Sequence, residues 1–188
     1  MSDPSSSHRA PVPAVRRIGA DEWPSIRAMR LEALRDEAAA IAFLDTYEEA
    51  AARPDSFWQE RAAGAARGTG AAQFVAVAGD GAWVGSVTGL REEAGARDWA
   101  GQPIERLQVH VVGVWVRPDH RGSGVLGRLV GAVGDWAGEH GVDRLRLLVH
   151  EDNARAQAAY RKLGFAATGV TVPLAAGHEL EMARGVSL

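Results

Sequence analysis

The segment VVGVWVRPDHRGSGVLGRL, residues 111–129, predicts a strand, a turn and a helix in succession. Valines and a tryptophan fill the first part, as is typical of a buried strand, and Pro118 then forces a turn. Gly122, Gly124 and Gly127 follow where a helix begins. A helix N-terminus offers unpaired N–H groups and a positive dipole end, so small residues there let a pyrophosphate approach the backbone. The alternative interpretation is a flexible turn between strand and helix.

This turn differs from two common phosphate-binding motifs. It lacks the Gly-Lys-Ser/Thr ending of a P-loop, and its glycines do not follow the G-x-G-x-x-G spacing of dinucleotide-binding folds. The phosphate-binding hypothesis therefore needs support from elsewhere in the chain.

The composition excludes several classes of function. The chain has 188 residues, enough for one domain with a sizeable core, and a net charge of −3, which does not favour nucleic acid or an anionic membrane as a partner. It has no cysteine, which excludes disulfides, thiolate metal sites and cysteine nucleophiles. Its six histidines show no metal-ligand spacing, so no metal is expected. Without a membrane segment or an apolar signal sequence, we expect a cytoplasmic protein.

Hydrophobic periodicity divides the chain into alternating strands and helices. Residues 1–11 are rich in serine and proline and are predicted to be a disordered tail, and residues 12–188 form a single domain. The domain is predicted as α/β, with a central twisted mixed sheet flanked by helices. Strands are expected at 12–18, 73–78, 82–90, 105–116, 143–149, 165–172 and 178–183, helices at 20–37 (with Asp21 as N-cap), 54–67, 122–140 and 154–163, and irregular structure at 38–53 and 92–104.

A second motif, NARAQAAYRKLGF at residues 153–165, follows the next predicted strand. Together with the first motif, it resembles the GNAT acetyltransferase superfamily. The family pattern is V-x-P-x-x-R-G-x-G-x-G followed, about thirty residues on, by N-x-x-A-x-x-x-Y-x-x-x-G-F. Both halves are present in order, and the resemblance covers residues 105–165 closely.

The resemblance implies a GNAT-like single domain, with a splayed strand pair, that uses acetyl-CoA as cosubstrate and acetylates a primary amine. The strand backbone at Val114, Trp115 and Val116 would pair with the pantetheine arm, and Gly113 could form a bulge. Asn153 would contact the cofactor, or act simply as a helix N-cap. The family usually has Gly or Ala where this chain has Leu126, which would either crowd the pyrophosphate or point into the helix–sheet interface. The residues whose backbone N–H groups would hold the pyrophosphate are Arg121, Gly122, Ser123, Gly124, Val125, Leu126 and Gly127.

The resemblance also implies an acid. Tyr160 matches the tyrosine proposed as general acid in many relatives, and it lies seven residues after Asn153, on the same helix face. A phenol with a pKa of about 10 keeps its proton at neutral pH and can donate it to a departing thiolate. The alternative is a core tyrosine.

The base is less clearly marked. His110 stands where several relatives have glutamate, and on an alternating strand it shares a face with Val112, Val114 and Val116 unless the bulge shifts it. It could take the proton of the amine, or be an ordinary hydrogen-bonded strand histidine. His150 and Glu151 are rival bases, and an amine that arrives neutral needs none.

The acceptor should contact the first two helices and the loop between them. Asp45, Tyr47, Glu48 and Glu49 lie there, and an acidic rim would favour a small cationic amine, although a solvated loop is the simpler interpretation. The acceptor could be a small molecule or a peptide, and a homodimer is compatible with such folds. Without a cysteine, we expect direct attack in a ternary complex. The alternatives are a transferase for another acyl-CoA, and a CoA-binding regulatory module without turnover.

Overall fold

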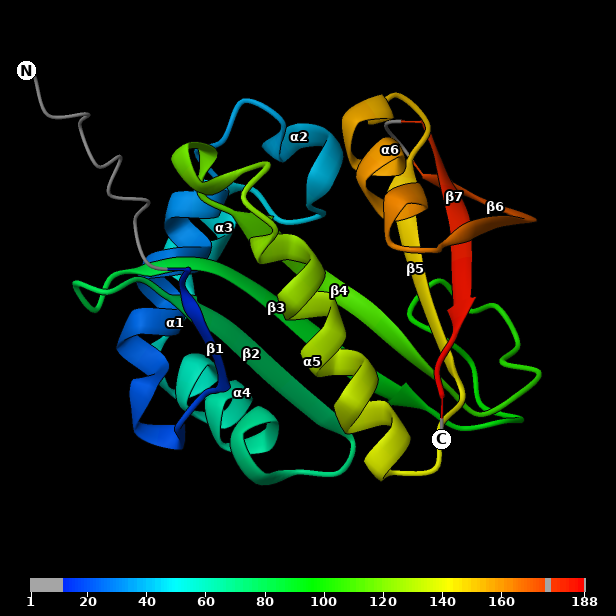
Figure 1. The fold of residues 1–188 in the computed structure, drawn as a ribbon, viewed down its shortest axis with the longest axis horizontal. Coiled ribbons are helices and arrows are strands. Elements are labelled where there is room, and N and C mark those ends of the chain that lie inside the picture. The colour runs from blue at the N-terminus through cyan, green and yellow to red at the C-terminus, as the bar shows by residue number, and fades with distance from the viewer. Residues whose placement is uncertain (1–11, 175–176, 188) are drawn as a thin grey trace, which may run out of the picture.

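A computed structural model describes residues 12–174 and 177–187, so the predicted tail at residues 1–11 lies outside the described residues. In this part of the chain the strands form one sheet in the order β1-β2-β3-β4-β5-β7-β6 (Figure 1). β4 and β5 pair in parallel and the other neighbours are antiparallel, which confirms the expected mixed sheet. The strands are β1 (Ala14–Arg17), β2 (Ala71–Val77), β3 (Trp83–Glu92), β4 (Gln108–Val116), β5 (Arg144–His150), β6 (Ala166–Leu174) and β7 (Gly177–Gly185).

Helices cover both faces of the sheet. α5 (Val125–Glu139) crosses one face (Figure 1), and α1 (Trp23–Ala33) and α4 (Asp55–Arg67) pack against the other. α6 (Ala154–Lys162) follows β5, and short 3-10 turns, η1 (Ala20–Glu22) and η2 (Pro118–His120), precede α1 and α5. No helix among the described residues is long and apolar enough to cross a membrane.

The first helix differs from its prediction. The expected N-cap Asp21 lies inside η1, and Glu22 instead accepts a hydrogen bond from the Gly19 backbone N–H at 2.7 Å. The irregular stretch 38–53 contains two short helices, α2 (Ala39–Ala42) and α3 (Tyr47–Ala52). α3 begins with a capping box in which Thr46 and Glu49 bond each other's backbone N–H groups. Helices this short have too little periodicity to be recognised in a sequence.

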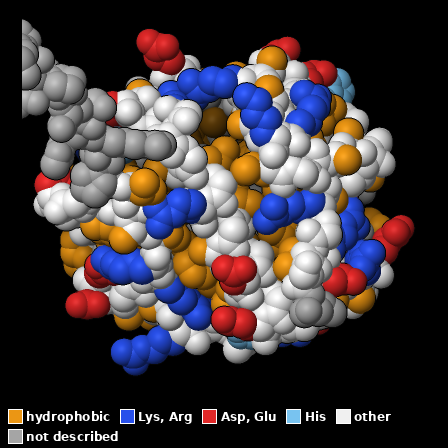
Figure 2. Space-filling view, in the orientation of Figure 1, with side chains coloured by type: hydrophobic (Ala, Val, Ile, Leu, Met, Phe, Trp, Pro, Cys, Tyr) orange, Lys and Arg blue, Asp and Glu red, His pale blue; other side chains and the backbone are white. Residues whose placement is uncertain are grey.

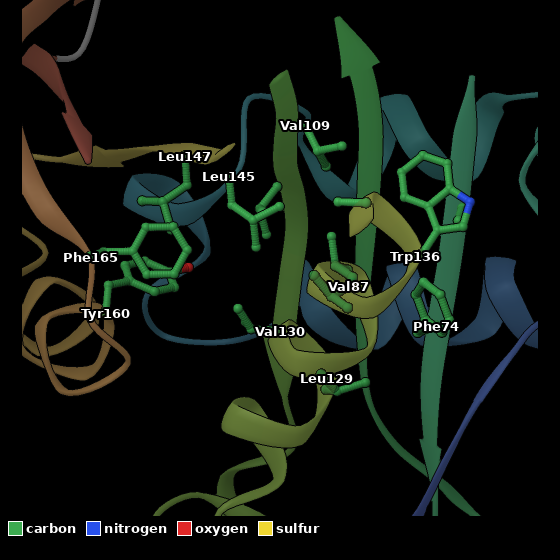
Figure 3. Close-up of a cluster of buried hydrophobic side chains, with 14 of the residues drawn as sticks. Phe74, Val87, Val109, Leu129, Val130, Trp136, Leu145, Leu147, Tyr160 and Phe165 are labelled. Carbon is green, nitrogen blue, oxygen red and sulfur yellow. The ribbon is translucent and has the colours of Figure 1, made fainter. Parts of the chain in front are cut away.

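The main core lies between α5 and the sheet. Figure 3 shows Phe74 and Trp136 at one end of this cluster and Tyr160 beside Phe165 at the other. A second cluster on the opposite face joins Ile26 of α1 and Trp58 of α4 to Val75 of β2. Successive residues along a strand therefore point alternately to the α5 side of the sheet and to the side that α1 and α4 cover.

A β-bulge in β4 changes which side chains share a face. The register runs from Ser86 opposite Trp115 to Thr88 opposite Val112, so β4 has one more residue than β3 here, and Gly113 has a φ of +60°. This confirms the bulge expected at Gly113. Val114 and Val116 pack on the α5 side, whereas His110 lines a pocket on the α1 and α4 side. The bulge thus separates His110 from the face of Val114 and Val116.

The pairing of β4 with β5 is short. It comprises Val109 with Leu145 and His110 with Arg146, and beyond these residues the strands diverge toward the N-terminus of α5 (Figure 1). This is the splayed pair expected from the sequence. Backbone groups of β4 past His110 are left without a partner strand on that edge.

A buried ion cluster holds the closed end of this divergence. Arg146 of β5 is 3% exposed and bonds Glu92 of β3 at 2.8 Å, Asp98 of the following loop at 2.9 Å and Glu181 of β7 at 3.2 Å. Burial opposes ionisation of Glu92, but the neighbouring His110 and Arg146 outweigh it and lower the pKa of Glu92 to about 2. The cluster joins three strands and the 93–107 loop by charge.

Replacing Arg146 with methionine should be strongly destabilising. It leaves buried carboxylates without a counter-charge, so we expect a loss of about 3–5 kcal/mol in the free energy of unfolding at pH 7. Because the folded-state pKa of Glu92 is depressed, its stabilising contribution exists above its ordinary pKa near 4.5 and disappears as pH falls toward 2. The difference between wild type and Arg146→Met, measured by urea denaturation, should therefore shrink between pH 6 and pH 3.

Arg144→Met is the matched control on the same strand. Arg144 is more exposed and contacts a single carboxylate, Glu181, at 3.1 Å. We expect a loss of about 1 kcal/mol or less for such a pair. Equal losses in the two variants would contradict the role given to the Arg146 cluster.

Candidate active site

The glycine-rich turn forms the N-terminus of α5. The first intrahelical bond runs from the Arg128 N–H to the Gly124 carbonyl at 3.2 Å, so the N–H groups of Val125, Leu126 and Gly127 have no acceptor within the helix. The N–H of Arg121 differs, because it donates to the Pro118 carbonyl at 3.3 Å. The anion-binding groups therefore lie after Arg121 along the turn.

The three glycines of the turn have different structural roles. Gly122 and Gly124 have φ values of +75° and +87°, and nothing lies within 4 Å of where a Cβ would stand, so these positions need glycine for conformation. Gly127 has an ordinary φ, but a Cβ there would lie 3.2 Å from Leu163 Cδ2. Gly127 thus allows close packing between α5 and the end of α6.

A cleft of about 580 Å³ runs from this turn into the gap between β4 and β5. Two predicted cofactor residues do not line it: the Ser123 hydroxyl donates to the His120 carbonyl at 2.6 Å, and Val125 is buried in the core at 1% exposure. Their backbone N–H groups are still part of the turn. Leu126 lines the cleft, as expected for a residue beside the pyrophosphate, and it also packs against the core at the helix–sheet interface. The predicted residues that line the cleft are Val114, Trp115, Val116, Arg121, Gly122, Gly124, Leu126, Gly127 and Asn153.

Cationic side chains surround this cleft. Arg155 and Lys162, seven residues apart on α6, are exposed and line it, and Arg121 lines it while pairing with Asp36. Figure 2 shows Lys and Arg side chains around a hollow with a hydrophobic interior on this face. A cleft with free N–H groups, excess positive charge and an apolar interior suits a ligand with phosphates at one end and a less polar arm.

Asn153 and Tyr160 lie on one face of α6 and both line the cleft, as their spacing predicts. The Asn153 side chain accepts a hydrogen bond from the Ala156 N–H at 3.1 Å, which confirms the N-cap. Tyr160 is 8% exposed, and its ring packs edge-on against Phe165 with centroids 5.9 Å apart. Burial, assisted by the negative charge of Glu179, raises the pKa of Tyr160 above its ordinary value. The phenol therefore keeps its proton at neutral pH.

A second pocket of about 290 Å³ opens on the face covered by α1 and α4. Its lining includes Phe43, Phe57, Trp99 and Trp115, so it is rich in aromatic rings. His110 lines this pocket, at 2% exposure, and its Nδ1 lies 3.2 Å from Glu92 Oε1. The structure therefore places His110 and Tyr160 on different cavities.

Glu179 of β7 is the one ionisable side chain among the described residues that lines both cavities. No hydrogen bond or ion pair with another described residue engages its carboxylate, and burial raises its pKa. The sequence does not mark Glu179 as a site residue, because an alternating strand gives no sign of which strand it will neighbour. Of the rival bases, His150 lines the cleft, whereas Glu151 is exposed, bonds His178 at 2.9 Å and lines neither cavity.

Residues 45–49 do not form an acidic rim around the second pocket. Of the four residues expected there, Asp45 alone lines the second pocket, and its carboxylate is paired with Arg30 at 3.2 Å and Arg53 at 3.0 Å. Tyr47 contacts Arg35, whose guanidinium donates a hydrogen bond to the Tyr47 hydroxyl at 2.6 Å. In the described part of the chain, no group of three His, Asp or Glu side chains is placed to hold a metal ion.

A scan against family models matches residues 23–165 to the "Acetyltransferase (GNAT) family", which covers more than half of the chain. The chain belongs to the GNAT acetyltransferase family. A search of curated proteins finds no match.

Solved GNAT structures share this fold over nearly the whole chain. A GNAT acetyltransferase from Streptococcus pneumoniae is 14% identical, with a TM-score of 0.72 over 93% of this chain and 99% of that one. A phosphinothricin acetyltransferase from Sinorhizobium meliloti, in complex with AcCoA, is 18% identical, with a TM-score of 0.70 over 93% and 89%. A GCN5-related N-acetyltransferase from Kribbella flavida is 25% identical, with a TM-score of 0.65 over 92% and 97%.

Gly124, the N-cap of α5, and Gly131 within that helix should respond oppositely to the same substitution. Gly124→Ala forces a Cβ into a left-handed conformation, so we expect a loss of about 1–2 kcal/mol. Gly131→Ala lies in the helix interior with open space around it, so we expect a gain of up to about 1 kcal/mol. Urea denaturation measures both, and equal effects would contradict the conformational role of Gly124.

Proposed function

We propose that this GNAT protein is an N-acetyltransferase that moves the acetyl group of acetyl-CoA to a primary amine by direct attack in a ternary complex. The observation that carries the proposal is that two cavities, one on each face of the sheet, meet where β4 and β5 diverge. Val111, Val112, Gly113, Leu148 and Glu179 line both. A thioester that enters from one side and an amine that enters from the other can meet at that point.

The cleft on the α5 side fits acetyl-CoA. The N–H groups from Gly122 to Gly127 would hold the pyrophosphate, and Arg155 and Lys162 would offset the remaining phosphate charge. The free edge of β4 at Val114 and Val116 offers backbone groups to the amides of the pantetheine arm. The AcCoA complex of the similar Sinorhizobium meliloti structure supports this choice of donor.

The reaction needs one acid. The amine nitrogen attacks the thioester carbonyl carbon, the tetrahedral intermediate collapses, and the C–S bond breaks to release a thiolate. Tyr160 lines the cleft with its proton retained, so it can protonate that sulfur. Its buried position also keeps bulk water away from the leaving group.

The reaction also needs a group that takes the proton of the amine. We assign the second pocket, on the α1 and α4 side, to the acceptor and call it the acceptor pocket. His110 lines this pocket and is the base that the sequence predicts. Glu179 is a second candidate, because it lines both cavities and burial raises its pKa above the ordinary value of a glutamate. A base must be deprotonated to act, so kcat/KM should rise with pH as the base loses its proton. Substitution of the residue that is the base removes this rise.

Tyr160→Phe should lower kcat at least about tenfold, the range for loss of a general acid, while the Kd for acetyl-CoA changes little. Tyr47→Phe is the control, because the only other tyrosine lines neither cavity. The measurement is CoA thiol release with a panel of amines, together with calorimetric binding of acetyl-CoA. An unchanged kcat in Tyr160→Phe would remove Tyr160 as the acid.

The position of the pyrophosphate is tested with Gly124→Glu. The added side chain should block the turn and repel the phosphates, so acetyl-CoA binding should be lost, while Gly131→Ala binds normally. Retained affinity in Gly124→Glu would place the pyrophosphate elsewhere. If acetyl-CoA raises the melting temperature but no amine is acetylated, the protein is a CoA-binding module and not a transferase.

A further inference from the structure

The acceptor pocket has an excess of positive charge at the end formed by α1 and α4. Arg30 of α1 and Arg61 of α4 line this end. Arg53 is not part of the lining, but it pairs with Asp45, which is. Asp45 is the one carboxylate at this end of the described lining, and both of its oxygens are already engaged, one by Arg30 and the other by Arg53. Three guanidinium groups therefore share a single counter-charge.

Arg61 is the guanidinium at this end that no carboxylate of the described residues pairs with directly. It makes no hydrogen bond or ion pair with any described residue, and its guanidinium lies 5.4 Å from the ring centroid of Phe57. The Arg53 guanidinium lies 4.3 Å from the same ring centroid. The Arg61 side chain is exposed and lines the pocket, so its guanidinium is accessible to a bound ligand. The ring attracts both cations, but the guanidinium groups of Arg53 and Arg61 repel each other, and an anion bound beside them would offset that repulsion.

The other end of the pocket carries the opposite charge. Glu179 lies on β7, whereas Arg61 lies on α4, which packs against β2. The floor runs from Gln73 on β2 across β3 and β4 to Leu148 on β5. From β2 to β4 this is two strand spacings of about 4.8 Å, or about 10 Å, and the gap between the diverging β4 and β5 adds to it, so the two charged ends are several covalent bonds apart.

We infer that the acceptor is a primary amine that also carries a carboxylate or similar anionic group several bonds from its nitrogen. Arg61, with Arg30 beside it, binds the anionic group, and the nitrogen then reaches the thioester beside Glu179. The planar guanidinium fork matches a carboxylate with two parallel hydrogen bonds, which fixes both the position and the direction of the acceptor. This inference rests on the proposed function, and it replaces the cationic amine expected from the sequence.

Three amines of equal chain length test the inference: ε-aminocaproate with an anionic end, hexylamine with an apolar end and hexamethylenediamine with a cationic end. In wild type, kcat/KM for CoA release should favour ε-aminocaproate over hexylamine by about tenfold, the contribution of one charge-assisted hydrogen-bond pair. Hexamethylenediamine should be the poorest of the three. Arg61→Met should abolish the preference for the anionic end, and Arg61→Glu should reverse it in favour of the diamine.

Arg67→Met is the matched control, because Arg67 is an exposed arginine on the same helix that does not line the pocket. It should keep the wild-type preference. Equal kcat/KM for the three amines, a wild-type preference for the diamine, or a preference for ε-aminocaproate that survives Arg61→Met would each overturn the inference.

Calorimetric binding of the same compounds to the protein with CoA separates the inference from the proposed function. If no amine is acetylated, yet ε-aminocaproate binds more tightly than hexylamine in wild type and not in Arg61→Met, the proposed function fails and the anion site stands. If turnover occurs without any dependence on the charged end, the function stands and the anion site is wrong. Absence of both turnover and preferential binding rejects the two together.

Discussion

The early end of the β4–β5 pairing is the constraint on which the site depends. Two parallel strands that stayed paired would close the sheet and leave no passage between its faces. Here pairing stops after His110 and Arg146, and the bulge at Gly113 re-aims β4 just beyond that point. The Arg146 cluster holds the strands together at the closed end, so the divergence has a fixed origin. The charged cluster that stabilises the fold and the unpaired edge of β4 that forms the site therefore lie next to each other along the same strands.

The local parts of this arrangement could be predicted from the sequence. Gly113, Gly122 and Gly124 all have positive φ values, and glycine is the residue that tolerates them. The interval from Asn153 to Tyr160 is two helical turns, so the two side chains share a face wherever the helix is placed. Such features depend on neighbours along the chain, and a single sequence contains that information.

The long-range parts could not be predicted in this way. Glu179 reaches the junction because β7 inserts between β5 and β6, which its own alternating pattern does not reveal. Asp45 resembles part of an acidic rim in the sequence, because one of its arginine partners, Arg30, lies on a separate helix, α1. Charge counted along a segment therefore gave the wrong sign for the pocket, since the sign depends on which elements the fold brings together.

In the proposed mechanism, the position of Glu179 would couple the two proton transfers. Burial is the main cause of the raised pKa of Tyr160, and the negative charge of Glu179 adds to it. If Glu179 accepts the proton of the attacking amine, that negative charge disappears and its contribution to the pKa of Tyr160 disappears with it. Tyr160 then becomes a stronger acid at the stage when the thiolate needs a proton. His110 lines only the acceptor pocket. If His110 were the base, its protonation would therefore not act on Tyr160 through a residue that both cavities share. The junction between the cavities would therefore serve both as the meeting point of the substrates and as the place where one proton transfer prepares the next.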